Sequence, residues 1–124
     1  MLTNDQIIRR FSAAMTRMDV NELIEYFTPD AVYIMVPMPP PLRGRKEIYD
    51  SLAGMPKRFK GVEIETISQI ASGNFVVSEL TAHLRLENQT LVLPMADFFE
   101  LENGKIKMWR EYFNVASFKT LKDG

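Results

Sequence analysis

The chain has 124 residues, which is enough for one domain, over residues 1–124, with its own hydrophobic core. Its formal net charge is −1, from 15 basic and 16 acidic residues. This argues against nucleic-acid binding, which needs a concentrated basic surface. The absence of cysteine excludes disulfides and thiolate metal sites, and the single histidine, His83, excludes a histidine-rich metal centre. We therefore expect no metal and no cofactor.

Membrane and nucleotide signals are also missing from the sequence. No apolar run approaches the roughly 20 residues of a membrane-spanning helix. The first residues, MLTNDQIIRRF, turn polar at once and lack the hydrophobic region of a signal peptide. The chain contains neither a Walker loop nor a GxGxxG run. We expect a cytoplasmic protein with no membrane or nucleic-acid partner.

The first part of the chain predicts two helices. Thr3 and Gln6 have the spacing of a capping box, and apolar residues follow at helical spacing, so we expect a helix over about residues 4–18. A second capping pattern opens a short helix over residues 20–27. The segment that contains Pro29 then ends this helix.

A strand, an extended segment and a third helix should follow. Residues 31–36, AVYIMV, are typical of a short strand. The segment 38–44, MPPPLRG, cannot be helical, because proline fixes φ and removes the backbone donor. It could be a rigid lip of a cavity or only a connector. The third helix is expected over about residues 45–55.

The second half of the chain predicts a sheet. Short polar turns separate four strand candidates, which indicates an antiparallel meander. Helices followed by strands make an α+β domain. A sheet that curls around a helix leaves a conical cavity, and such cavities bind small molecules. The four strand candidates are residues 62–71, 74–86, 90–101 and 105–115.

One aspartate interrupts the apolar strand LVLPMADFFEL. If the following turn is centred on Asn103, Asp97 lies opposite Trp109 and Met95 lies opposite Glu111. Alternation then places Asp97 and Glu111 on one apolar face, within reach of each other. Two buried carboxyl groups share protons, so that the pKa of one rises and the pair supplies an acid and a base at the same pH. Epoxide opening needs such a pair.

Each of these residues also has a purely structural interpretation. Asp97 could be a structural carboxylate bonded to Trp109 or to a backbone amide. Glu111 could form a salt bridge with a neighbouring Arg or Lys. Tyr33 could be an amphipathic core residue, since its body is apolar and its tip is polar. His83 alternates with polar residues and is expected on the outer face of its strand, at the surface or in a dimer contact.

Three segments, PDAVYIMVP, LRGRKEI and ENGKIKMWREYF, resemble the nuclear transport factor 2-like superfamily. Within it the chain is similar to the SnoaL-like group, which includes limonene epoxide hydrolase and ketosteroid isomerase. The resemblance covers about residues 4–118. It implies an α+β fold in which a cone-shaped, curved antiparallel sheet wraps around N-terminal helices. It also implies a homodimer through the outer sheet face.

The resemblance also implies candidate site residues. Glu111 stands where the epoxide hydrolases keep a water-activating aspartate, and Tyr33 matches their water-holding tyrosine. Met35 stands in place of their asparagine, and Leu80 and Ala82 in place of their arginine and second aspartate.

The ketosteroid isomerases give a second set of matches. Asp97 matches the aspartate that these enzymes keep protonated beside an oxyanion. Met35 and Phe11 stand in place of their general base and their oxyanion tyrosine.

We therefore expect an enzyme with Asp97, Glu111 and Tyr33 as catalytic residues. Epoxide hydrolysis or epoxide-opening cyclisation ranks above ketosteroid-isomerase-like isomerisation, because no base stands at Met35. The alternative is a non-catalytic module of the same fold that binds a small hydrophobic ligand or mediates dimerisation. The residues expected to bind a small apolar substrate are Phe11, Met35, Leu80, Ala82, Leu93, Met95, Trp109 and Phe113.

Overall fold

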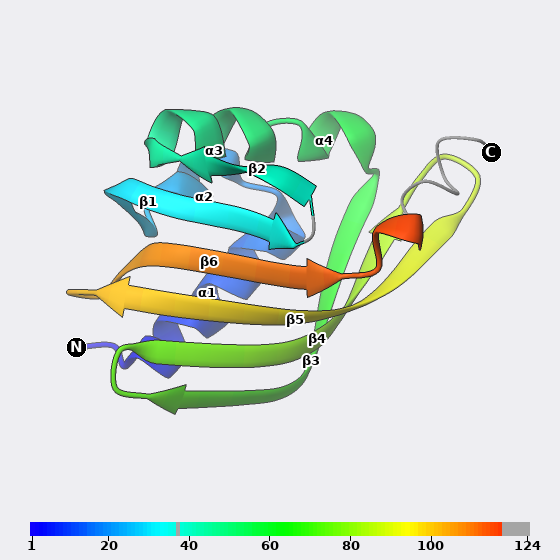
Figure 1. Ribbon diagram of the computed structural model, residues 1–124. Coiled ribbons are helices and arrows are strands. Elements are labelled where there is room, and N and C mark those ends of the chain that lie inside the picture. Colours follow the sequence, from blue (N-terminus) through cyan, green and yellow to red (C-terminus); the bar gives the residue numbers. More distant parts are fainter. Residues whose placement is uncertain (37, 118–124) are drawn as a thin grey trace.

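The computed structural model describes residues 1–36 and 38–117, so that Pro37 and residues 118–124 lie outside the described part. Within that part, four helices accompany one six-stranded sheet (Figure 1). The helices are α1 (Asn4–Arg17), α2 (Val20–Ile24), α3 (Gly44–Leu52) and α4 (Met55–Arg58). The strands are β1 (Phe27–Val36), β2 (Met38–Arg43), β3 (Gly61–Ser72), β4 (Phe75–Arg85), β5 (Thr90–Glu102) and β6 (Lys105–Phe113).

The sheet has the strand order β2-β1-β6-β5-β4-β3. Strands β3 to β6 form the predicted antiparallel meander, and the α+β class with a curved sheet is confirmed. The prediction of a purely antiparallel sheet was wrong at one pair, because β1 runs parallel to β6. Parallel neighbours need a long crossover connection, and here the chain from β2 to β5 provides it.

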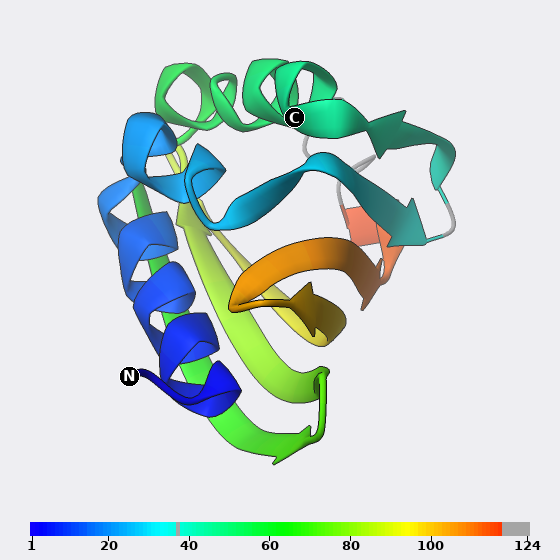
Figure 2. The same cartoon turned by 90° about the vertical axis from the view of Figure 1, so that its left-hand side faces the viewer.

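Helix α1 lies along the sheet, and α3 and α4 lie across one end of it (Figure 2). The predicted capping box of α1 is present. The Thr3 hydroxyl accepts a hydrogen bond from the backbone N–H of Gln6, and the side-chain oxygen of Gln6 accepts one from the backbone N–H of Thr3. The apolar face of α1 is buried, which fixes the helix to the core. The buried residues of this face are Ile7, Ile8, Phe11 and Ala14.

Two helix ends differ from the prediction. Helix α2 stops at Ile24 rather than at residue 27, because Phe27 already belongs to β1. In addition, Pro29 disfavours helical dihedral angles at the preceding residue, Thr28. The third predicted helix, over residues 45–55, ends at Leu52 as α3, and the short helix α4, which was not predicted, follows from Met55. The ring of Pro56 would clash with the carbonyl of Leu52 in one continuous helix.

The proline-rich segment before α3 is extended, as predicted, and forms the edge strand β2. An edge strand tolerates proline, since a missing N–H there breaks no hydrogen bond of the sheet. Among the described residues, no helix is long and apolar enough to cross a membrane.

The outer face of the sheet carries exposed apolar side chains, Ile70, Phe75, Val92 and Tyr112 among them. The homodimer expected through this face stays a prediction, which sedimentation at several protein concentrations would test.

Candidate active site

A cavity of about 400 Å³ lies between α1, the α3–α4 region and the inner face of the sheet. Ligand pockets usually have volumes of this order. Its lining is mostly apolar. Every residue that the sequence predicted for the site borders this one cavity. They are Phe11, Tyr33, Met35, Leu80, Ala82, Leu93, Met95, Asp97, Trp109, Glu111 and Phe113.

Asp97 and Glu111 are direct cross-strand partners in the β5–β6 hairpin. The predicted register, with Asp97 opposite Trp109 and Met95 opposite Glu111, was wrong by two residues. The hairpin turns on two residues rather than one, and a register irregularity follows between Glu100 and Leu101. Because side chains alternate with a period of two, a two-residue slip keeps the same face inward. The predicted inner face therefore survives the error.

The Tyr33 hydroxyl, on β1, donates a hydrogen bond of 2.5 Å to Glu111 Oε1. The Tyr33 ring stacks on Trp109, with ring centroids 3.9 Å apart and planes 8° apart. Phe11 contacts the same indole edge-on at 5.2 Å. These rings hold Tyr33 in one orientation, with its hydroxyl directed at the carboxyl pair. Tyr33 is therefore a core residue whose polar tip belongs to the site.

Burial sets the protonation of the carboxyl pair. The Asp97 residue is 4% exposed and Glu111 is 8% exposed. Burial and the Glu111 charge raise the pKa of Asp97 well above its ordinary value. Burial also raises the pKa of Glu111, but hydrogen bonds from Tyr33 and Asp97 favour its charged form and leave its pKa at about 7. At neutral pH, Asp97 is thus a proton donor beside a partly ionised Glu111.

Two buried polar atoms at the cavity have no hydrogen-bond partner among the described residues. They are Asp97 Oδ1 and Trp109 Nε1. The indole N–H of Trp109 lowers the pKa of Asp97, but it does not form a hydrogen bond of good geometry with Oδ1. Native proteins leave few buried polar groups unpaired, so both atoms are suited to contacts with a ligand.

The structural interpretation of Glu111 as a salt-bridge partner does not hold within residues 1–36 and 38–117, where its polar contacts are Tyr33 and Asp97. His83 lies on the outer face of the sheet, as expected, and its Nε2 is 3.5 Å from Glu65 Oε1. No three His, Asp or Glu side chains of the described chain are grouped so that they could hold a metal ion.

Four polar residues border the cavity that were not predicted from the sequence, namely Ser12, Ser51, Arg58 and Ser78. Of these four, the buried one is Ser78. It is 2% exposed, borders the cavity and is the cross-strand partner of Asp97 on the other side. The signal was a serine on the inward face of β4, which is otherwise apolar. Met15, Met55 and Leu84 also border the cavity and were not predicted to do so.

A family model described as a SnoaL-like domain matches residues 8–109. Among solved structures, an LEH-like epoxide hydrolase from M. tuberculosis is 28% identical, with a TM-score of 0.81 over 96% of this chain and 89% of that chain. A nuclear transport factor 2-like protein of unknown function from Burkholderia pseudomallei K96243 is 20% identical, with a TM-score of 0.85 over 98% of each chain. A putative SnoaL-like polyketide cyclase from Shewanella putrefaciens CN-32 is 15% identical, with a TM-score of 0.85 over 100% of this chain and 99% of that chain. The last two likenesses bear on the fold alone.

Proposed function

Since this chain belongs to the SnoaL-like domain family, we propose that it is a small-molecule enzyme that opens epoxides, by hydrolysis or by cyclisation. The observation that carries this proposal is the buried pair Asp97 and Glu111 at one apolar cavity. The pair holds one carboxyl group as an acid while the other is available as a base.

In the proposed reaction Asp97 gives its proton to the epoxide oxygen as the C–O bond breaks. Glu111 takes the proton of the attacking water, or of a hydroxyl in the same molecule, as the new C–O bond forms. Tyr33 holds Glu111 in place through its hydrogen bond. Hydrolysis yields a diol, and attack by an internal hydroxyl yields a cyclic ether. A proton then passes from Glu111 to Asp97, its cross-strand partner, and restores the starting state.

The 28% identity to an LEH-like epoxide hydrolase supports hydrolysis. The cyclisation branch rests on the chemistry of the pair, because a general base can take a proton from an internal hydroxyl as well as from water. Double-bond isomerisation ranks lower, because the residue expected in place of the isomerase base is Met35, which cannot accept a proton.

The second candidate is a non-catalytic protein that binds a small apolar ligand. It is favoured by Leu80 and Ala82, which are apolar and buried at the positions where the resemblance implies catalytic charges.

A panel of terpene and polyketide epoxides, tested against wild type, Asp97→Asn and Glu111→Gln, decides between the two candidates. Acid–base catalysis contributes about 10²–10⁴-fold, so we expect each variant to lose at least about 100-fold in turnover. Glu63→Gln, on the exposed outer face of β3, is the matched control and should turn over like wild type. Equal turnover by all four proteins would remove both carboxyls from the mechanism. A wild type that binds apolar ligands tightly without converting any epoxide would favour the binding protein.

A further inference from the structure

Four polar side chains lie in one row across the sheet, and three of them border the cavity. Gln69, Ser78, Asp97 and Glu111 are successive cross-strand partners on β3, β4, β5 and β6. The reaction proposed above uses only the last two. Ser78 borders the cavity beside them, and what it offers to a ligand depends on where its hydroxyl proton points.

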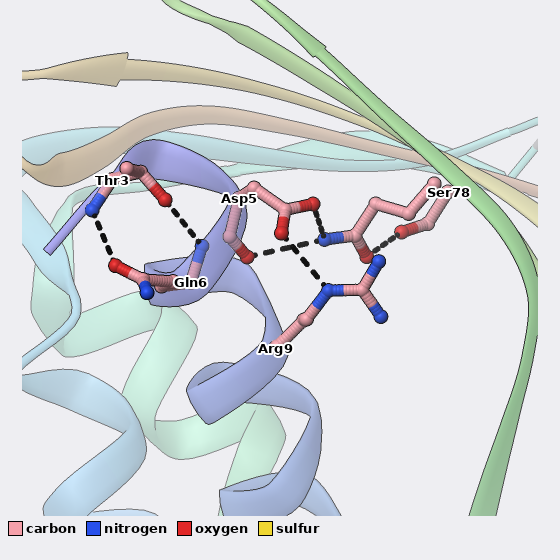
Figure 3. A network of polar contacts seen from close by, with 6 residues as sticks. Thr3, Asp5, Gln6, Arg9 and Ser78 are labelled. Carbon is pink, nitrogen blue, oxygen red and sulfur yellow. Dashed lines mark hydrogen bonds and ion pairs between the residues drawn. The ribbon is translucent and has the colours of Figure 1, made fainter.

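A hydrogen-bond network outside the cavity fixes that proton (Figure 3). The Gln69 amide donates from Nε2 to Asp5 Oδ1 at 2.9 Å and to the Asp5 carbonyl at 3.2 Å. Both of these atoms are acceptors, so the amide has its nitrogen toward α1 and its oxygen toward Ser78. Ser78 Oγ donates to that oxygen at 2.5 Å. The orientation of the amide therefore determines the direction of the hydroxyl.

Arg9 holds the far end of this network. Its Nε lies 3.0 Å from Asp5 Oδ2. Hydrogen bonds from Arg9 and then from Gln69 lower the pKa of Asp5. This carboxylate therefore stays ionised at ordinary pH and continues to accept the hydrogen bond from the Gln69 side-chain amide. The direction of the Ser78 hydroxyl therefore does not change with pH near neutrality.

A serine hydroxyl has one donor and two acceptor lone pairs. With its proton committed to Gln69, Ser78 offers the cavity only an acceptor. The protonated Asp97 donates its hydrogen bond to Glu111. Its Oδ1, which has no partner among the described residues, is therefore the carbonyl oxygen of the acid and a second buried acceptor. Two neighbouring acceptors without a donor fit a ligand that carries an O–H or N–H group.

From this arrangement we infer that Ser78 is a substrate-binding residue, which together with Asp97 Oδ1 accepts a hydrogen bond from a hydroxyl of the ligand. The ligand is thus an apolar molecule with at least one free hydroxyl. Where the proposed function holds, the substrate class is a hydroxylated epoxide, and only that step rests on the proposed function. If Ser78 served only to anchor α1 to the sheet, its removal would lower stability and leave ligand selectivity unchanged.

Matched pairs of apolar alcohols and ketones, such as menthol and menthone, test this inference, because the two members differ in one hydrogen-bond donor. Trp109 is the single tryptophan and borders the cavity, so its fluorescence reports binding. We expect wild type to bind the alcohol about three- to tenfold more tightly than the ketone. Ser78→Ala should bring this ratio close to one.

A second variant tests the network and a third serves as control. Gln69→Leu frees the Ser78 hydroxyl to donate into the cavity, so the preference for alcohol over ketone should fall although Ser78 is still present. Ser68→Ala removes a comparable β3–β4 side-chain contact, from Ser68 to Glu79, on the outer face and should keep the wild-type ratio. Circular dichroism confirms that each variant is folded.

The outcomes separate this inference from the proposed function. No preference for the alcohol in wild type, or an unchanged ratio in Ser78→Ala, overturns the role of Ser78. Alcohol selectivity that Ser78→Ala abolishes, in a protein that converts no epoxide, supports the role of Ser78 and refutes the enzyme. Conversion of epoxides with no effect of Ser78→Ala on the choice between hydroxylated and plain substrates refutes the role of Ser78 alone.

Discussion

Two carboxyl groups that face each other in an apolar cavity cannot both be ionised without a large free-energy cost. In this protein the neighbours of the two groups differ, and that difference assigns the proton. Glu111 accepts a hydrogen bond from the Tyr33 hydroxyl, and this bond stabilises its anion. Asp97 has no comparable donor in good geometry within the described chain. The proposed assignment of Asp97 as acid and Glu111 as base therefore depends on the Tyr33 hydroxyl.

Tyr33→Phe removes that hydroxyl and keeps the ring that stacks on Trp109. The pKa of Glu111 should then rise above its wild-type value of about 7, because its anion loses a charge-assisted hydrogen bond. The ionised fraction of Glu111 at pH 7 should fall roughly tenfold. Infrared titration of the carboxyl band measures this shift without a substrate, and the acid limb of the pH–rate profile should move to higher pH with it.

Tyr49→Phe provides the control for this measurement, because Tyr49 bonds to Asn21 at the surface, away from the cavity. It should leave the Glu111 titration where it is. An unchanged Glu111 titration in Tyr33→Phe would show that Tyr33 does not control the base.

At the residue scale, the sequence predicted the buried carboxyl pair and much of its apolar lining, but not the hydrogen-bond network that orients Ser78. Asp97 stood out because a charge in an apolar strand needs a reason. Ser78 did not stand out, because a buried serine is common and its role depends on Gln69 and Asp5, which are distant in sequence. Hydroxyl direction follows from a three-dimensional network that no local pattern encodes.

At the element scale, the β5–β6 hairpin sets the geometry of the site. Its turn residues, Asn103 and Gly104, both have positive φ, at 50° and 78°, as in a type I′ turn. The Asn-Gly pair predicted a tight turn here. The sequence could not predict the irregularity after Glu100, because bulges depend on how the sheet bends. The end of α2 was misplaced for a similar reason, since the burial of Phe27 in β1 overrides the helical pattern before it.

Gly104→Ala tests the contribution of this turn. The new Cβ would lie 3.5 Å from Ile7 Cδ1, which is ordinary contact, so the cost comes from the left-handed backbone alone. We expect a loss of about 1–2 kcal/mol in the free energy of unfolding, measured by urea denaturation. Gly54→Ala, at a φ of −73°, should cost much less. Equal losses in both variants would show that the turn conformation is not what stabilises the hairpin.

At the scale of the whole molecule, the parallel pairing of β1 with β6 could not be predicted from the sequence. It joins residues 76 to 79 positions apart in the chain, and nothing in either strand indicates the direction of its partner. This pairing nevertheless completes the site, because it places Met35 beside Glu111 and brings the Tyr33 hydroxyl onto the same carboxyl. The proposed catalytic residues near the end of the chain therefore depend on a strand formed near its start.

The buried pair should also make the whole fold less stable as pH rises. In the folded protein the pKa values of Asp97 and Glu111 lie above their ordinary values, so the folded state binds more protons than the unfolded chain. Stability is then greatest near and below the unfolded pKa values, falls as pH rises toward the folded values, and levels off above them. For Glu111 a rise from 4.5 to about 7 corresponds to a loss on the order of 3 kcal/mol.

Urea unfolding between pH 4.5 and 8, followed by Trp109 fluorescence, measures this slope. The double variant Asp97→Asn with Glu111→Gln lacks both titrating groups, and the difference between the two stability curves cancels the contribution of every other group. Asp5 does not contribute to this slope, because its pKa is lowered and the group titrates only in more acidic solution. We expect the wild-type curve to fall relative to that of the double variant across this window. Parallel curves would mean that the two carboxyls are not held protonated by burial, and the acid–base pair would lose its physical basis.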